Sequence, residues 1–247
     1  MFIDEEIFSI LVDMKYWLLF ISLVILVSCS SQRQTTDKAK QVVNAAIEAH
    51  GGMEHWQNLE TLKFKKKTVL YNADGSIERS SLERHTLHQK DTLHGQIVSI
   101  DPNQKYTTRF SDMEGQKIMA DTVLDGTNAF LSSHFVVNQP FKMLDPGVEL
   151  SYLGVDTLAN GKVVDVVKAY YGSEEDDVWW FYFDTESHVL LATLIYHSPT
   201  YAFVDNEKME MIDGMLWNTE RTTYRTDSLR NVEYVRAEFV YSEMECK

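Results

Sequence analysis

From Thr61 to the end of the chain, apolar and polar side chains alternate in short runs with a period of two residues. A period of two places successive side chains on opposite faces of a strand, so these runs predict β-strands. Turn sequences such as Asn-Ala-Asp-Gly at 72–75 and Asp-Gly at 125–126 separate the runs. They recur about every 8–15 residues, a spacing typical of an antiparallel sheet or barrel and not of βαβ units. We therefore expect about ten or eleven antiparallel strands, one of them at 129–137.

The segment before these strands predicts a short helix from Asp37 to about His50. Asp37 is a suitable N-cap, the apolar residues at 42, 43, 46 and 47 share one helical face, and Gly51-Gly52 provides the stop. One interruption of the strand pattern, at 141–153, predicts a short helix or a covering loop. No low-complexity linker divides the chain, so we predict a single β domain over residues 37–247.

Residues 14–29 have the character of a secretory signal. Lys15 precedes an uncharged run at 16–28, which has the length of a signal h-region and is short for a membrane span. The run ends in Leu26-Val27-Ser28-Cys29, which resembles the bacterial lipobox and implies lipidation of Cys29. We predict a lipoprotein signal peptide at 1–28 and a polar tether at 29–36. The alternative, a plain transmembrane anchor, lacks stop-transfer charges.

The first 13 residues do not fit a signal peptide, because they carry four acids where an n-region is positively charged. We therefore expect translation to start at Met14. No Asp follows Cys29 directly, and an Asp there can signal retention in the inner membrane during lipoprotein sorting. The sequence thus favours an outer-membrane lipoprotein that faces the periplasm.

The charge balance bounds the partners of the chain. Its 247 residues include 23 Lys and Arg against 37 Asp and Glu, for a formal net charge of −14. Phosphate contact needs clustered cations, so a nucleic-acid partner is not expected. The only cysteines, Cys29 and Cys246, exclude a disulfide scaffold and a multi-Cys metal cage. The expected membrane contact is the lipid on Cys29, and the oligomeric state is left open.

Three patterns occur in order along the chain: 49–52 (Ala-His-Gly-Gly) followed by Trp56, 124–130 (Leu-Asp-Gly-Thr-Asn-Ala-Phe), and 180–191 (Trp-Phe-Tyr-Phe-Asp-Thr-Glu-Ser-His-Val-Leu-Leu). Together they resemble the LolA/LolB-like superfamily, and envelope lipoproteins of Bacteroidota that share this fold. The resemblance implies a mostly β (α+β) fold: an antiparallel, incompletely closed β-barrel with a short N-terminal helix and a covering segment on its concave side. It also implies a hydrophobic cavity that holds an acyl chain or a lipoprotein.

The aromatic run at 179–183 is the candidate ligand site. Trp179, Phe181 and Phe183 share one face of a strand, and Trp180 and Tyr182 share the other. Either the strand is covered on both sides, or one set lines an apolar pocket. A nearby Met-rich stretch would then add an adaptable wall. The candidate ligand-binding residues are Trp179, Phe181, Phe183, Met209, Met211 and Trp217.

The sequence indicates no metal site, no cofactor and no catalytic residue. His85 and His88 point to opposite faces of a strand, so with His94 they do not form a ligand set. The acids at 174–177 lack the spacing of a calcium loop and predict a solvated hairpin tip. Lys63, Lys65 and Lys67 share a strand face that is either plainly exposed or set against anionic lipid head groups. No Gly-x-Ser-x-Gly motif occurs.

These observations favour an envelope lipoprotein that binds a hydrophobic ligand without chemistry. Two alternatives stay open: a hydrolase acting on lipid or glycan, and a structural partner in an envelope assembly that binds through a sheet edge. The cavity distinguishes them. A large cavity without titratable groups favours binding, and a cleft where histidines and carboxylates converge favours an enzyme.

Overall fold

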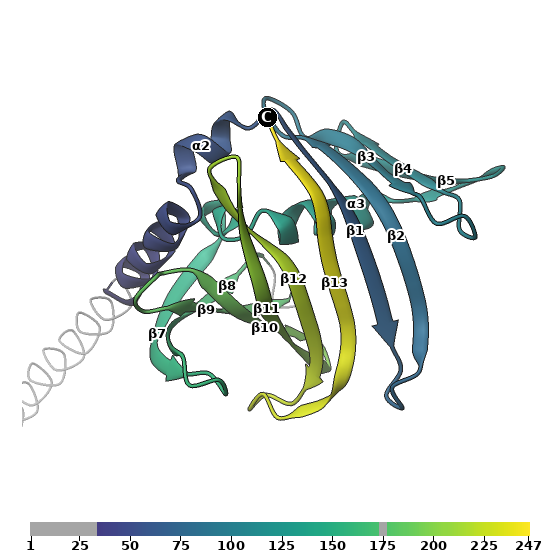
Figure 1. Ribbon diagram of the computed structural model, residues 1–247. Helices are drawn as coiled ribbons and strands as arrows, with labels where there is room; N and C mark the ends of the chain where they lie inside the picture. The colour runs from purple at the N-terminus through teal and green to yellow at the C-terminus, as the bar shows by residue number, and fades with distance from the viewer. Residues whose placement is uncertain (1–33, 173–176) are drawn as a thin grey trace, which may run out of the picture.

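The computed structural model describes residues 34–172 and 177–247. Within these residues, 13 antiparallel strands form one sheet in the order β6-β5-β4-β3-β2-β1-β13-β12-β11-β10-β9-β8-β7. The sheet curves strongly, and its edge strands β6 and β7 do not pair, so the barrel stays open (Figure 1). The predicted mostly β fold with an incompletely closed barrel is confirmed, with more strands than the ten or eleven expected.

The element bounds follow the turn signals of the sequence. The strands are β1 (Thr61–Tyr71), β2 (Ile77–His88), β3 (His94–Ser99), β4 (Thr107–Ser111), β5 (Glu114–Met119), β6 (Thr122–Asp125), β7 (Glu149–Thr157), β8 (Val163–Tyr170), β9 (Val178–Asp184), β10 (Leu190–His197), β11 (Thr200–Ile212), β12 (Met215–Thr226) and β13 (Val232–Cys246). The helices are α2 (Met53–Asn58), α3 (Thr127–Val137) and the short 3-10 helix η1 (Phe141–Leu144). Residues 34–49 are also helical.

The helix over 34–49 packs one apolar stripe on the sheet. Its buried residues recur at intervals of three and four, the spacing of one helical face. They are Ala39, Val42, Val43, Ala46 and Ile47. The prediction that Asp37 caps this helix is wrong, because residues 34–36 are already helical. None of these three is Gly or Pro, so nothing in them stops the helix.

The structure also differs from the prediction at helix α3. Residues 129–137 were expected to form a strand, and they lie in α3. Thr127 N–H donates to Asp125 Oδ1 at 2.8 Å, which turns the chain into the helix. The buried residues of α3 are Phe130, Ser133, His134 and Val137, at helical spacing. Ser133 and His134 interrupt the apolar side chains on this buried face, and the sequence pattern therefore predicts a strand here instead of a helix.

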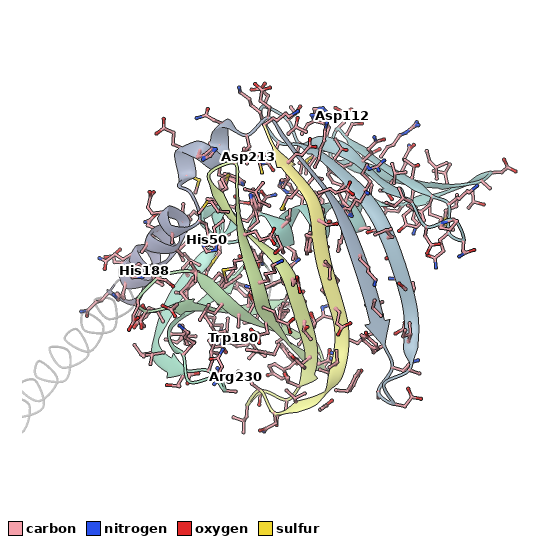
Figure 2. The ribbon with its side chains drawn as sticks, in the orientation of Figure 1. His50, Asp112, Trp180, His188, Asp213 and Arg230 are labelled. Atoms are coloured by element: carbon pink, nitrogen blue, oxygen red, sulfur yellow. The ribbon has the colours of Figure 1, made fainter. Side chains whose placement is uncertain are left out.

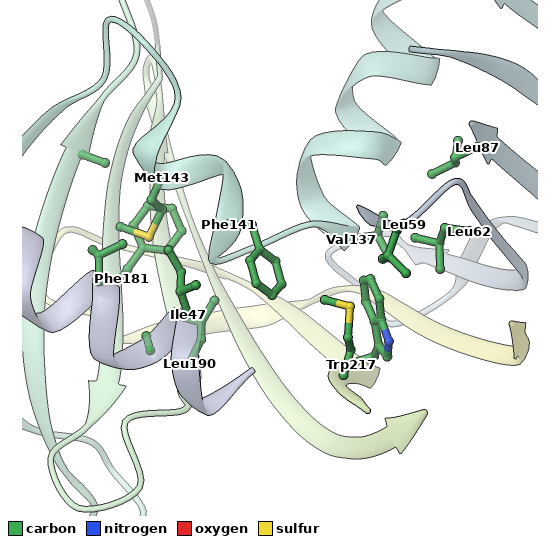
Figure 3. Close-up of a cluster of buried hydrophobic side chains, with 14 of the residues drawn as sticks. Ile47, Leu59, Leu62, Leu87, Val137, Phe141, Met143, Phe181, Leu190 and Trp217 are labelled. Atoms are coloured by element: carbon green, nitrogen blue, oxygen red, sulfur yellow. The ribbon is translucent and has the colours of Figure 1, made fainter. Parts of the chain in front are cut away.

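One core cluster lies between the concave face of the sheet and the helices. It takes side chains from the helix over 34–49, α3, η1 and both halves of the sheet. In Figure 3, Phe141 lies between a group containing Ile47 and Phe181 and a group containing Val137 and Trp217. The Phe141 ring also stacks on Trp56 of α2, with centroids 5.4 Å apart. The helices are thus part of the core and not an addition to a finished barrel.

A second, smaller cluster covers the opposite face of β8 to β11. It contains Tyr182, Leu194 and the half-buried Trp180. Arg230, in the β12–β13 connection, lies over the Tyr182 ring at 5.1 Å and forms an ion pair with Asp156 of β7 at 2.7 Å (Figure 2). Strand β9 therefore has apolar neighbours on both faces, which explains why its residues 179–183 are all aromatic.

Several sequence predictions fall outside the described residues. They are the signal peptide at 1–28, the start at Met14, lipidation of Cys29, residues 29–33 of the tether, and the acids at 174–176. In the part of the chain that the structure describes, no helix combines the length and apolar character needed to cross a membrane.

The Gly51-Gly52 stop brings the end of the first helix against the β11–β12 hairpin (Figure 2). Leu216 N–H donates to the His50 carbonyl oxygen at 3.1 Å. Gly51 has a φ of 114°, and a Cβ at this position would lie 2.8 Å from the Gly214 carbonyl oxygen. Only glycine satisfies both the backbone conformation and the close approach.

We predict that Gly51→Ala lowers the free energy of unfolding by about 2–4 kcal/mol, from backbone strain together with the clash. The matched control is Gly75→Ala, because Gly75 has a φ of 82° with no neighbouring atom within 4 Å. It should lose only about 1–2 kcal/mol. Chemical denaturation of both variants checks this, and equal losses would show that the contact with the hairpin contributes nothing.

Candidate functional site

A cavity of about 630 Å³ lies between α3 and the strands β1 to β5 with β13. Its lining is mixed. Apolar side chains come from Leu70, Ile97, Met119, Ala129 and Phe239. Polar and charged side chains come from Lys66, Thr68, Arg79, Ser81, Glu83, His85, Asn103, Gln104, Lys105, Tyr106, Thr108, Lys117 and Ser133. The volume is that of a small-molecule site, and the lining suits a ligand with both an apolar and a polar part.

Three polar side chains form a chain of hydrogen bonds in the cavity wall. Ser133 Oγ lies 3.2 Å from His85 Nδ1, and His85 Nε2 lies 3.1 Å from Glu83 Oε2. The network assigns the tautomer: Ser133 donates to Nδ1, and Nε2–H donates to Glu83. Tyr106 also donates its hydroxyl to Glu83. The His85 ring is buried and stacks on Phe64 with centroids 4.6 Å apart.

The burial of these groups sets their charge. Burial opposes ionisation of Glu83, but the hydrogen bonds from His85 and Tyr106 and the charge of Lys66 outweigh it and lower its pKa to about 2. Burial lowers the pKa of His85, against the raising effect of Glu83. Glu83 is therefore a carboxylate and His85 a neutral imidazole near neutral pH. Neutral His85 keeps both of its ring nitrogens satisfied.

Two lysines of the cavity lie on aromatic rings. Lys66 Nζ is 5.2 Å from the centre of the Phe239 ring, and Lys117 Nζ is 4.1 Å from that of Tyr106. Lys66 stands directly opposite Glu83 in the β1–β2 register, yet its Nζ forms no ion pair within 4.0 Å with a described residue. The lysine thus extends toward β13 and keeps its charge free at the cavity wall.

The candidate ligand residues of the aromatic strand lie in the main core. Phe181 and Phe183 are fully buried, and half-buried Trp179 packs edge-on against Phe135 of α3 at 5.2 Å. Neither they nor Trp217, which is 2 % exposed, lines the cavity under α3. They pack against the helices that cover the concave face of the sheet.

The two methionines are separated from Trp217. In the β11–β12 register Trp217 pairs with Glu210, while Met209 pairs with Asn218 and Met211 with Leu216. Met209 and Met211 therefore point to the face opposite Trp217. Met211 is also 62 % exposed. The structure does not bring the six candidates together into one site.

The three histidines divide as their spacing predicts. His85 points into the cavity, whereas His88 stacks on His94 across β2 and β3 with centroids 4.6 Å apart. Within the described ranges, no group of three or more His, Cys, Asp or Glu is placed to hold a metal ion. Cys246 is a buried thiol, and burial raises its pKa to about 11.

The sequence carried one signal for the cavity that its lysine cluster obscured. Lys63, Lys65 and Lys67 share one face, but Lys66 falls on the other, in line with buried Leu62 and Phe64. A lysine that continues a buried alternating set is a candidate for a functional cation. Glu83 and His85 follow the same logic on β2. Ser133 has no such signal, because the pattern of its segment predicts a strand and not a helix.

No family model matches the chain, and neither does any curated protein sequence. Three solved structures match with TM-scores of 0.55–0.59 and 11–12 % identity. They are a DUF1329 family protein from Desulfovibrio piger (0.59, 12 %, 85 % of this chain and 93 % of that one), a putative outer membrane lipoprotein-sorting protein domain from Vibrio parahaemolyticus (0.59, 12 %, 86 % and 93 %), and a LolA superfamily protein from Nitrosomonas europaea (0.55, 11 %, 85 % and 93 %). At this identity the likeness shows the fold alone.

We predict a pH-dependent stability from His134, which faces the sheet from α3. Burial, with a smaller effect of Lys142, lowers its pKa to about 4, while the unfolded value is about 6.5. As the pH falls below about 6.5, the unfolded chain binds the proton first, so stability present at higher pH is lost. Between about pH 7.5 and about pH 5 this loss is about 2 kcal/mol.

The measurement is chemical denaturation of the wild type and His134→Gln at both pH values. The variant should lose about 2 kcal/mol less than the wild type over this range. His188→Asn changes an exposed side chain and serves as the control. An unchanged pH dependence in His134→Gln would contradict the prediction.

Proposed function

We propose, starting from the LolA-like fold of this chain, that it is an envelope lipoprotein that binds an amphiphile, such as an acyl chain or a lipid, in the cavity under α3 without changing it chemically. One observation carries the proposal: the cavity of about 630 Å³ beneath a helix that covers an open sheet. A filled concave face would have left no room for a ligand.

The predicted anchor suits this function. Four residues, 30–33, separate Cys29, the predicted lipidation site, from the start of the described helix at Gln34, so the two ends lie at most about 17 Å apart. Lipid chains on Cys29 would therefore keep the domain close to the membrane surface. An amphiphile leaving or entering the bilayer would meet the cavity there. The neighbour from Vibrio parahaemolyticus is a putative outer membrane lipoprotein-sorting protein domain, which is in keeping with this role.

We predict that a photoactivatable fatty acid, supplied to cells that express the full-length chain, cross-links to α3 and to the strands under it. Ala129→Trp places a large side chain at the cavity lining and should reduce capture about tenfold, because it excludes the ligand sterically. The control is Asn128→Trp, because Asn128 is exposed like Ala129 but does not line the cavity. Peptide mapping by mass spectrometry measures both, and equal capture in the two variants would contradict the proposal.

A second candidate function, hydrolysis of a lipid ester, is favoured by the Ser133–His85–Glu83 chain. Its order of contacts is that of a nucleophile, a base and an orienting acid. Against it, Ser133 lies inside α3, where backbone N–H groups serve the helix and not an oxyanion. We therefore place binding first.

The two functions differ in the reactivity of Ser133. For a binding protein, a fluorophosphonate probe should leave Ser133 unlabelled, and Ser133→Ala should retain fatty-acid capture. Mass spectrometry of the probe-treated protein measures the label. A covalent adduct on Ser133 that is lost in Ser133→Ala and in His85→Gln would instead establish the hydrolase.

A further inference from the structure

We propose that the ligand of this cavity is an anionic amphiphile, with its carboxylate or phosphate head held at Phe239 by Lys66 and Arg221. The inference rests on the proposed function and adds the charge of the ligand and the residues that recognise it. The positive charge of the cavity distinguishes it from the rest of the chain, because the chain as a whole is strongly acidic.

Arg221 of β12 carries the argument furthest. Arg221 is 5 % exposed, and its guanidinium forms no ion pair within 4.0 Å with any acid among the described residues. It donates to the Tyr241 hydroxyl and, at 3.5 Å, to the Val136 carbonyl oxygen, while Nε has no partner among the described atoms. A buried cation without a counter-ion is costly, and an anionic ligand would offset that cost.

Phe239 connects Arg221 to the cavity. The Phe239 ring lines the cavity, with Lys66 Nζ 5.2 Å and Arg221 Cζ 5.8 Å from its centre. Arg221 and Phe239 are neighbours in the β12–β13 register, and Phe239 and Thr68 in the β1–β13 register. Two cations therefore meet at one aromatic ring on the concave face. Arg can clamp a carboxylate or phosphate in a planar fork, and Lys adds a point charge.

The other cationic side chains of the cavity lining also lack an acidic partner. Arg79, Lys105 and Lys117 also line it, and none of them forms an ion pair within 4.0 Å in the described ranges. Elsewhere in those ranges seven Lys and Arg side chains are paired with acids, among them Lys65 with Glu243 and Arg236 with Glu78. The cavity thus presents unpaired cations in a protein rich in available partners.

One carboxylate, Glu83, also lines the cavity, and both of its oxygens already accept a hydrogen bond. His85 and Tyr106 donate to its two oxygens. It balances part of the positive charge without reaching Lys66 or Arg221 within 4.0 Å. The apolar side chains of Leu70, Ile97 and Met119 complete the lining. They offer the acyl chain an apolar wall beside the cationic end.

The experiment compares two photoactivatable probes of equal chain length, a fatty acid and the corresponding fatty alcohol. The full-length chain is held in vesicles of zwitterionic phosphatidylcholine, and cross-linked protein is quantified by mass spectrometry. We expect the acid to be captured at least about tenfold better than the alcohol, as for a hydrogen-bonded charged group. Lys66→Gln should lose most of this preference. Lys67→Gln, one residue along on the exposed face, should keep it.

Each outcome decides the matter. Equal capture of acid and alcohol by the wild type would overturn the anionic head and leave the proposed function standing. Capture of neither probe would overturn both. An acid preference that survives in Lys66→Gln and in Arg221→Gln would also overturn the assignment of these residues.

Two further measurements control for misfolding and for binding of a free anion. Arg221 is buried, so Arg221→Gln is read only if its thermal unfolding stays cooperative, and Lys66→Arg, which keeps the charge, should restore the preference. Millimolar inorganic phosphate should not displace the fatty acid, because it lacks the chain. Displacement by phosphate alone would assign the site to a free anion and overturn the amphiphile.

Discussion

The concave face of an unclosed sheet has to be covered by something other than the sheet, and here α3 is one part of that cover. Phe130 stacks on Phe110 of β4 with centroids 4.5 Å apart, Ser133 bonds His85 of β2, and the Val136 carbonyl accepts from Arg221 of β12. These three contacts hold one helix over distant strands. They set its height above the sheet, and therefore the room left for a cavity.

This cover explains why the interior is polar where the cavity lies and mostly apolar around Phe141 and Phe181. Around Phe141 and Phe181 the helices and the sheet exclude water and form an ordinary core. Beneath α3 the burial of polar side chains is compensated by hydrogen bonds between them, such as the one from His85 to Glu83. Arg221 is the exception, since its charge has no acid within 4.0 Å in the described ranges. A ligand anion would neutralise the charge of Arg221, which no acid among the described residues pairs with.

Local rules account for most of the sheet. The alternation of Leu62, Phe64 and their neighbours predicted β1, and the turn at 72–75 lies between β1 and β2 as expected. The helix α3 was missed because Ser133 and His134 interrupt its buried face, so its period was not apolar. β7 was missed for a related reason: as an edge strand it exposes Leu153 and Val155, and its alternation is weak.

The sequence by itself determined the strand pattern, the helix stop at Gly51-Gly52 and the acidic charge, because each depends on residues close together in the chain or on their number. Only the tertiary structure decided which polar groups are buried. His85 finds its partner Ser133 48 residues away, and Lys66 meets Phe239 on a strand from the other end of the chain. Whether a charge can remain inside depends on such partners, and these are brought together by the curvature of the sheet and the helix laid across it.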